Sequence, residues 1–304
     1  MSMNKNLILI SFLLFNTSQV NAQITCKDVF SEKKLSLNIS KIIQRNENPF
    51  DVARKNRQKD TLLSNTILKD VENRLENEAV VKIENLGGGV NTSYKITFES
   101  GLMAAYKPVN PDRPNQPARE AIAYKLSKLL NLDIVPPTVV RELKGDIPNE
   151  LKNISGSVQL FVHTAKPLKK GKLPNDEKIL IYKEVTFDPD LSLSGRRLRI
   201  FDWLINNHDR GSNAGNYLVS NVDSYIIGID HSVSFVGHDK AARSDKIPYY
   251  KSEFLNDVEF YNKLTSVSRE EIRKSLEGLN PVRIDEFFER YDKLIADFEK
   301  VLAH

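Results

Sequence analysis

The chain has 304 residues with 40% hydrophobic content, which is enough to bury a sizeable core as one large domain or two lobes. Its formal net charge is +4, and lysine and arginine are spread along the chain instead of forming one tract. The charge therefore gives no reason to expect a nucleic-acid partner. The single cysteine, Cys26, excludes an internal disulfide.

The first 22 residues have the three parts of a secretory signal peptide. Lys5 supplies a positive charge, Leu7–Phe15 is a short apolar segment, and residues 20–22 (VNA) form a small-residue cleavage motif. An apolar segment of about nine residues is too short to span a bilayer. We therefore expect residues 1–22 to be a signal peptide, and the mature chain to be secreted or periplasmic without stable membrane insertion.

Residues 23–78 are polar and charged, and we expect an N-terminal helical extension with helices near residues 35–44 and 61–76. From residue 79 to residue 163, short apolar runs separated by turn residues predict a β-rich N-lobe with one embedded helix. The predicted strands are Val80–Leu86, Thr92–Phe98, Leu102–Lys107, Thr138–Leu143 and Ser157–Val162, and the predicted helix is Ala118–Leu130. The first three strands should form an antiparallel meander.

Residues 164–304 predict a mainly helical C-lobe. Its first part, residues 166–173, is basic and predicts a loop. A helix that ends near residue 205 carries Trp203, which we expect in the hydrophobic core. It leads through a polar loop to a hairpin of Asn216–Val219 and Tyr225–Ile229. Further helices are predicted at residues 254–264, 268–276 and 283–302.

Four polar residues around this hairpin are candidates for phosphoryl transfer. Asp209 lies on the loop, Asn216 begins the hairpin and Asp230 ends it. Phosphoryl transfer uses one carboxylate to orient the attacking hydroxyl, and an asparagine with a second carboxylate to hold Mg²⁺ or Mn²⁺. We therefore predict that Asp209 orients the hydroxyl and that Asn216 and Asp230 are metal ligands. Arg210 is a predicted catalytic residue that either steadies the loop or neutralises phosphate charge.

Three features of the N-lobe are candidates for ATP binding. The loop of Gly87, Gly88 and Gly89 allows a backbone to approach phosphates closely. Lys107 ends an apolar strand, as the phosphate-binding lysine of kinases does, and Glu120 on the following helix is its candidate partner. Taken alone, the glycine loop also fits a plain hairpin turn, Lys107 a solvated lysine at a strand end, and Glu120 an acidic residue in the first turn of a helix. These three features, followed along the chain by Asp209, Asn216 and Asp230, together predict an ATP-binding phosphotransferase.

A family resemblance covers residues 80–240. The segments that carry it are Arg119-Glu120, Ala123-Tyr124, Val135-Pro136-Pro137-Thr138, Asn207-His208-Asp209-Arg210, Gly215-Asn216-Tyr217-Leu218 and Ile229-Asp230-His231. Together they resemble a bacterial branch of atypical kinases related to the phosphatidylinositol 3- and 4-kinases, the HipA-type toxin kinases and the secretory-pathway casein kinases.

The resemblance implies an α+β, two-lobed protein-kinase-like fold with ATP held between the lobes. Carried over by position, Lys107 is the phosphate-binding lysine, Glu120 its partner, Asp209 the catalytic-loop aspartate, and Asn216 and Asp230 the metal ligands. Relatives usually have a histidine two positions after the loop aspartate, where this chain has Gly211, and their asparagine follows five residues after it. For that reason Asn213 is a second candidate ligand, and His208 is a candidate substitute for the missing histidine.

Three functions remain open at this point. The first is a secreted kinase that uses ATP and Mg²⁺ or Mn²⁺, with a protein serine or threonine as the acceptor and lipid or sugar hydroxyls as alternatives. The second is a nucleotide-binding scaffold, or pseudokinase, without turnover. The third is a metal-dependent hydrolase with His208, Asp209, Asp230 and His231 as ligands.

Overall fold

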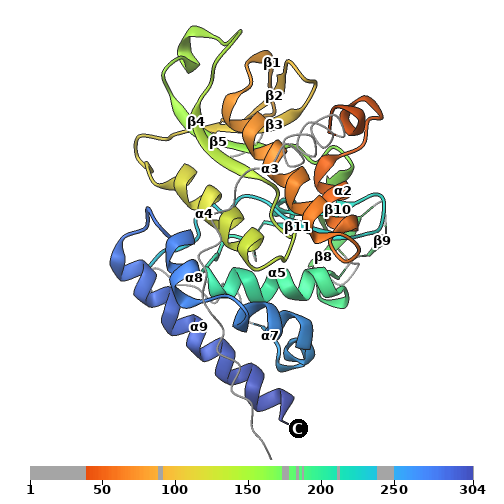
Figure 1. The fold of residues 1–304 in the computed structure, drawn as a ribbon, viewed down its shortest axis with the longest axis vertical. Coiled ribbons are helices and arrows are strands. Elements are labelled where there is room, and N and C mark those ends of the chain that lie inside the picture. Colours follow the sequence, from red (N-terminus) through yellow and green to blue (C-terminus); the bar gives the residue numbers. More distant parts are fainter. Residues whose placement is uncertain are drawn as a thin grey trace, which may run out of the picture.

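The computed structural model describes residues 39–87, 92–172, 178–182, 185–186, 188–210, 213–237 and 250–303. The expected signal peptide, Gly88, Gly89 and Gly211 lie outside these residues. The five-stranded sheet occupies one end of the molecule and the C-terminal helices the other, with the embedded helix between them (Figure 1). Within the described residues, no helix is both long enough and apolar enough to cross a membrane.

The five predicted N-lobe strands form one antiparallel sheet in the order β1-β2-β3-β5-β4. The strands are β1 (Val80–Asn85), β2 (Tyr94–Phe98), β3 (Met103–Pro108), β4 (Thr138–Glu142) and β5 (Ser155–Leu160). Alternate residues of β2 and β3, among them Ile96, Phe98, Ala104 and Tyr106, are buried, as expected for strands with one face on a core. The predicted meander is therefore confirmed.

The N-terminal segment contributes two helices, α2 (Pro49–Asn56) and α3 (Thr61–Asn77), which pack against each other. α3 begins at the predicted residue because the side chain of Asp60 accepts a hydrogen bond from the Leu63 N–H, and it packs against β4 and β5. α2 was not expected from the sequence, although Asn48 as its cap and Pro49 at its first turn are a helix-start signal. Residues 39–44 are also helical.

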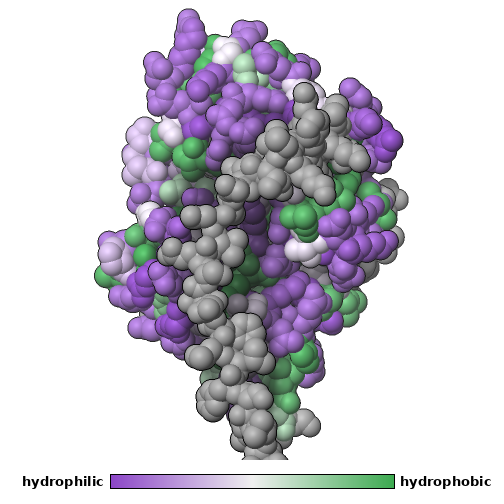
Figure 2. Space-filling model, in the orientation of Figure 1, coloured by the Kyte–Doolittle hydropathy of each residue, from purple (hydrophilic) through white to green (hydrophobic). Residues whose placement is uncertain are grey.

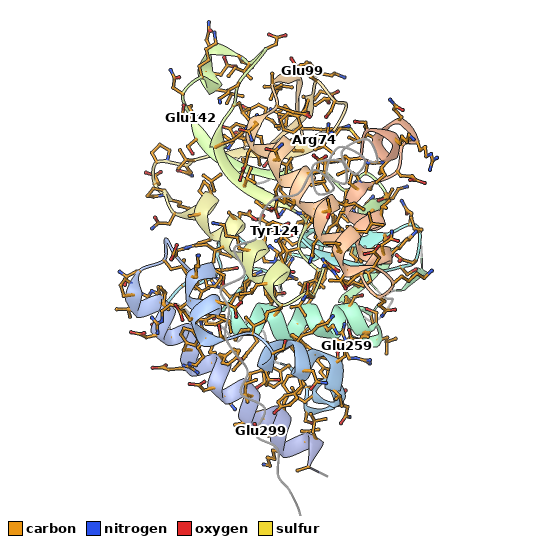
Figure 3. All side chains as sticks on the ribbon, viewed as in Figure 1. Arg74, Glu99, Tyr124, Glu142, Glu259 and Glu299 are labelled. Atoms are coloured by element: carbon orange, nitrogen blue, oxygen red, sulfur yellow. The ribbon has the colours of Figure 1, made fainter. Side chains whose placement is uncertain are left out.

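The embedded helix α4 (Gln116–Leu129) packs against β4, β5 and the C-terminal helix α8, and thus joins the two ends of the molecule. Its Tyr124, labelled in Figure 3, donates a hydrogen bond to Glu72 of α3. Lys128 reaches the same carboxylate, with Nζ 2.6 Å from Oε1. These two contacts therefore also attach α4 to α3 of the N-terminal segment.

In the second half of the chain, α5 (Leu193–Leu204) precedes the predicted hairpin, whose strands are β10 (Tyr217–Ser220) and β11 (Ile226–Gly228). The prediction of a loop at residues 166–173 is wrong in part, because β6 (Ala165–Pro167) pairs with β10 and β7 (Lys169–Lys172) pairs with β8. The remaining elements are β8 (Lys178–Tyr182), β9 (Val185–Thr186), α7 (Val258–Thr265), α8 (Arg269–Ser275), α9 (Pro281–Leu302) and the short 3-10 helices η1 (Asn149–Leu151), η2 (Pro189–Leu191), η3 (Ala214–Asn216) and η4 (Ser252–Asn256).

Helices α4, α5, α7, α8 and α9 enclose a second core around Leu198, Phe201, Phe260 and Phe287. Trp203, which was expected in a core, is half-buried, packs against this core and contacts Tyr250 edge-on, with ring centroids 4.8 Å apart. Hydrophilic side chains dominate the visible surface over the N-lobe sheet (Figure 2). The predicted α+β arrangement, with a β-rich part containing one embedded helix and a mainly helical part, is confirmed.

Candidate active site

Three charged side chains from distant parts of the chain meet at the end of β3. The Nζ atom of Lys107 lies 2.9 Å from Glu120 Oε1 on α4 and 3.0 Å from Asp230 Oδ1, which follows β11. The Lys107 side chain is 26% exposed, whereas that of Glu120 is 3% exposed. The structure therefore contains the predicted ion pair of Lys107 and Glu120, and the same ammonium group reaches the predicted metal ligand.

Regular elements and local bonds hold each member of this group. Lys107 pairs with Ser157 across β3 and β5, so the sheet fixes its backbone. Glu120 lies on the buried face of α4, and its Oε2 accepts a hydrogen bond from the His231 N–H at 3.0 Å. Asp230 has a φ of 57°, in the left-handed region, which turns the chain sharply at the end of the hairpin.

The charges of the group are set by burial and by one another. Burial alone acts to lower the pKa of Lys107, but the carboxylates of Glu120 and Asp230 raise it above its ordinary value. Burial raises the pKa of Glu120, and Lys107 opposes this effect. For Asp230 the effect of burial is outweighed by Lys107, which lowers the pKa to about 2. At neutral pH the site therefore presents a fixed cation with an ionised carboxylate beside it.

Asp209 and Asn216 form a second pair. The Asn216 Nδ2 donates a hydrogen bond to Asp209 Oδ2 at 3.0 Å. Asn213, the second candidate ligand, is exposed, and its Oδ1 accepts a hydrogen bond from the Gly215 N–H at 3.1 Å as the cap of η3. Asn216 is therefore the asparagine that faces Asp209.

The hairpin brings the two predicted metal ligands to one end. Tyr217 and Gly228 are paired across β10 and β11, and the Ile229 N–H donates to the Asn216 carbonyl at 3.1 Å. Asn216 therefore lies opposite Ile229, the residue before Asp230, at the same end of the hairpin. The spacing expected from the sequence, with one ligand before the first strand and one after the second, leads to this juxtaposition.

Arg210, predicted either to steady the loop or to neutralise phosphate charge, is buried. Its side chain is 1% exposed and lies 2.5 Å from Asp202 Oδ2 through Nε. Its Nη1 donates to the carbonyls of Asn216 at 2.5 Å and Ile229 at 2.8 Å, and its Nη2 lies 2.8 Å from His231 Nε2. Arg210 is therefore a positioning residue that holds both ends of the hairpin, which is the first of the two roles considered for it.

Sequence reasoning missed two members of this buried network, Asp202 and Asn207. Asp202 is fully buried on α5, and Asn207 Nδ2 donates to its Oδ1 at 2.9 Å. A signal was present, because Asp202 follows the core residue Leu198 by four positions and so shares its helix face. A buried carboxylate on that face requires a partner such as Arg210.

The N-terminal extension also supports the hairpin. The guanidinium group of Arg54 on α2 lies 3.0 Å from Asp51 and 2.7 Å from Asp223, which is in the hairpin turn. It also stacks over the ring of Tyr225, 4.1 Å from the centroid. α2 therefore clamps the turn at the end of the hairpin opposite to Asn216 and Asp230.

Of the predicted glycine loop, only Gly87 lies within the described residues. It follows β1, is exposed and has a φ of 64°. The Leu86 N–H donates to the Ser93 carbonyl at 2.9 Å, so this segment closes the β1–β2 hairpin. A role of Gly87, Gly88 and Gly89 over phosphates stays a prediction.

The side chains present fit a magnesium or manganese ion that shares its ligands with a nucleotide. Asn216 and Asp230 offer hard oxygen ligands, and Mg²⁺ is typically held by one or two carboxylates together with substrate phosphates. Asp230 Oδ1 lies 3.0 Å from Lys107 Nζ and accepts a hydrogen bond from Ser232 Oγ at 2.9 Å. In the described part of the chain, no group of three or more His, Cys, Asp or Glu side chains is arranged to hold a metal by itself.

The hydrolase alternative requires His231 as a metal ligand, and the structure contradicts this. His231 is fully buried, and its Nε2 contacts Arg210 at 2.8 Å. Burial, followed by the charge of Arg210, lowers its pKa well below the ordinary value. Nε2 of His231, held against the guanidinium group of Arg210, is therefore not available as a metal ligand.

Comparisons with known proteins give one curated relative and several solved structures. No protein-family model matches the chain. Protein Rv2133c of Mycobacterium tuberculosis is 30% identical over 162 residues, which are 43% of this chain and 54% of that protein. The matched segment thus spans about half the length of this relative.

Several solved structures are similar to the chain, and kinases are among them. The Golgi casein kinase with Mn and ADP bound has 16% identity and a TM-score of 0.49, over 78% of this chain and 76% of that chain. Hydra Fam20 with sugar has 14% identity and a TM-score of 0.48, over 78% and 89%. The proinflammatory kinase CtkA of Helicobacter pylori has 12% identity and a TM-score of 0.43, over 75% and 95%.

These neighbours belong to the class that the segments around Asp209 and Asp230 resemble, the atypical kinase-like proteins. Identities of 12–16% and TM-scores of 0.43–0.49 mark a distant likeness. The function is therefore inferred below from the side chains of this chain.

Proposed function

We propose that the chain is an exported ATP-dependent kinase that transfers the γ-phosphate of ATP to the hydroxyl of a protein serine or threonine. The observation that carries the proposal is the contact of Lys107 with both Glu120 and Asp230. A lysine anchored by a buried glutamate beside a carboxylate ligand is the arrangement by which kinases hold ATP phosphates and their metal.

The protein's own residues supply positioning and charge. Lys107 binds phosphate oxygens, and Glu120 keeps its ammonium group in place. Asn216 and Asp230 would hold a Mg²⁺ or Mn²⁺ ion, which would supply positive charge to neutralise the phosphates. Arg210 fixes the backbone at both of these ligands.

Asp209 acts on the acceptor. Its carboxylate, oriented by Asn216, accepts a hydrogen bond from the attacking hydroxyl and takes up the proton. A bond forms between the acceptor oxygen and the γ-phosphorus, the bond to the β–γ bridging oxygen breaks, and ADP leaves. Most of the rate enhancement in such a site comes from orientation and electrostatic stabilisation.

A thermal-shift titration of the chain from Gln23 with ATP tests the nucleotide site. We expect stabilisation that requires both ATP and Mg²⁺ or Mn²⁺, that disappears with EDTA, and that is lost in Asp230→Ala. Asp223→Ala is the matched control, because Asp223 lies in the turn at the opposite end of the same hairpin. Absence of any nucleotide-dependent shift would favour a scaffold without catalysis.

A further inference from the structure

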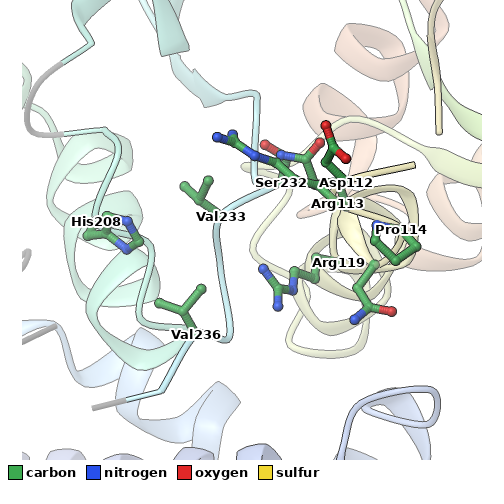
Figure 4. A pocket seen from close by; sticks show the side chains of 10 residues that line it. Asp112, Arg113, Pro114, Arg119, His208, Ser232, Val233 and Val236 are labelled. Carbon is green, nitrogen blue, oxygen red and sulfur yellow. The ribbon is translucent and has the colours of Figure 1, made fainter. Parts of the chain in front are cut away.

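A pocket of about 400 Å³ lies beside the proposed nucleotide site and has no part in the mechanism above. Arg113 and Arg119 line it from the start of α4, while His208 and Ser232 line it from the loops that carry Asp209 and Asp230. Figure 4 shows the Arg119 side chain projecting into the space between α4 and Val233, with His208 on the opposite wall. Lys107 and Glu120 are not among its walls.

The pocket is lined by two arginines and one carboxylate, Asp112, and no ion pair joins Asp112 to either arginine among the described residues. Within those residues, neither Arg113 nor Arg119 forms a side-chain hydrogen bond or an ion pair. Arg119 is half-buried, and burial, together with the nearby charge of Arg283, lowers its pKa. A guanidinium group that is partly desolvated, unpaired and close to a second cation is stabilised by an anion.

Two further features favour an anion. The cap residue of α4, Asn115, makes no side-chain capping bond, so the positive end of the helix dipole is open toward the pocket. The acidic wall residue, Asp112, is exposed, and its carboxylate points away from Arg119 in Figure 4. Asp230, two residues before the wall residue Ser232, is paired with Lys107 at 3.0 Å.

We propose that this pocket binds a small phosphomonoester, with the phosphate dianion held by Arg119 and Arg113. The planar fork of a guanidinium group matches two phosphate oxygens, and two arginines match the charge of the dianion. The volume exceeds what a bare phosphate requires, which leaves space for a small organic group against Val233 and Val236. The bound dianion joins α4 to the loops around Asp209 and Asp230. This site does not depend on ATP hydrolysis or transfer.

Isothermal titration of the chain from Gln23 tests the proposal, with inorganic phosphate and O-phosphoserine as probes and serine and chloride as blanks. Nucleotide and metal are left out, and ionic strength is held constant. We expect saturable binding of both phosphate probes and none of the blanks. Arg119→Ala should weaken phosphate binding at least tenfold, as expected for a lost charge-assisted hydrogen bond, and Arg119→Lys should weaken it less.

Arg45→Ala is the control, because Arg45 is an exposed arginine of the N-terminal segment, outside the walls of the pocket, and its loss changes the net charge equally. It should bind phosphate as the unchanged chain does. Equal phosphate affinity in the unchanged chain and in Arg119→Ala would overturn the proposal, because the ion would then sit elsewhere, for example at Lys107. Absence of saturable phosphate binding would overturn it as well. Far-UV circular dichroism of both arginine-119 variants shows that they are folded.

Discussion

Replacement of Arg210 by methionine should lower the free energy of unfolding by about 4–5 kcal/mol. The side chain is 1% exposed, and its main partner, Asp202, is equally buried. Loss of the guanidinium group leaves that carboxylate unpaired in the interior, which typically costs about 3–5 kcal/mol. The carbonyls of Asn216 and Ile229 also lose a donor, at about 1 kcal/mol or more each, and protonation of Asp202 recovers part of the total.

Urea denaturation at neutral pH measures this loss, with Arg199→Met as the matched control on the same stretch of chain. Arg199 pairs with Asp190 at 3.1 Å but is 25% exposed, so its removal should cost about 1 kcal/mol or less. In the double variant Asp202→Asn with Arg210→Met, the loss should be smaller than the sum of the single losses by about 1–3 kcal/mol. A loss below about 1.5 kcal/mol for Arg210→Met would refute the view that this buried pair holds the hairpin.

Three further outcomes are expected. Asp209→Asn should leave Mg-ATP binding unchanged and reduce phosphoryl transfer by about 10²–10⁴-fold in a single-turnover assay, and transfer at the unchanged rate would exclude Asp209 as the base. Arg57→Ala should cost about 3–5 kcal/mol in urea denaturation, because Arg57 lies 2.7 Å from the buried Asp133, and a loss near zero would show that this pair does not anchor the extension. Lys107 lowers the pKa of Asp230 to about 2, below the unfolded value of about 3.9. The contribution of ionised Asp230 to the free energy of unfolding is therefore present above about pH 4 and is lost as the pH falls toward about 2. Asp230→Asn should flatten the acid limb of the stability profile over that window, and an unchanged profile would contradict the ion pair.

Local patterns were sufficient to predict the five strands of the N-lobe sheet, most of the helices and the hairpin, but not β6 to β9. The alternation of β2 and β3 and the turn cluster between β10 and β11 are encoded within a few residues of each element. The same local logic placed Asn216 and Asp230 at one end of the hairpin. α2 was missed because eight residues give a weak helical period, although its cap and Pro49 were visible.

Contacts between distant segments were not predictable in the same way. The sequence around Lys107 does not indicate that its ammonium group reaches Asp230 as well as Glu120. The contact with Asp230 depends on how the hairpin packs against the sheet. The role of Arg210 depends likewise on burial, which only the folded chain reveals. The clamp of Arg54 on Asp223 gives the N-terminal extension a purpose that its composition did not suggest.

Transfer of phosphate from ATP to a protein hydroxyl can be detected directly on peptides. The chain from Gln23 is incubated with ATP, Mn²⁺ or Mg²⁺ and a library of unmodified peptides, and phosphoserine and phosphothreonine are detected by mass spectrometry. We expect phosphopeptides with the unchanged chain and none above background with Asp209→Asn or Asp230→Ala. Metal-dependent ATP binding without any phosphopeptide would contradict transfer to protein hydroxyls, and phosphopeptides formed equally by both variants would contradict the site.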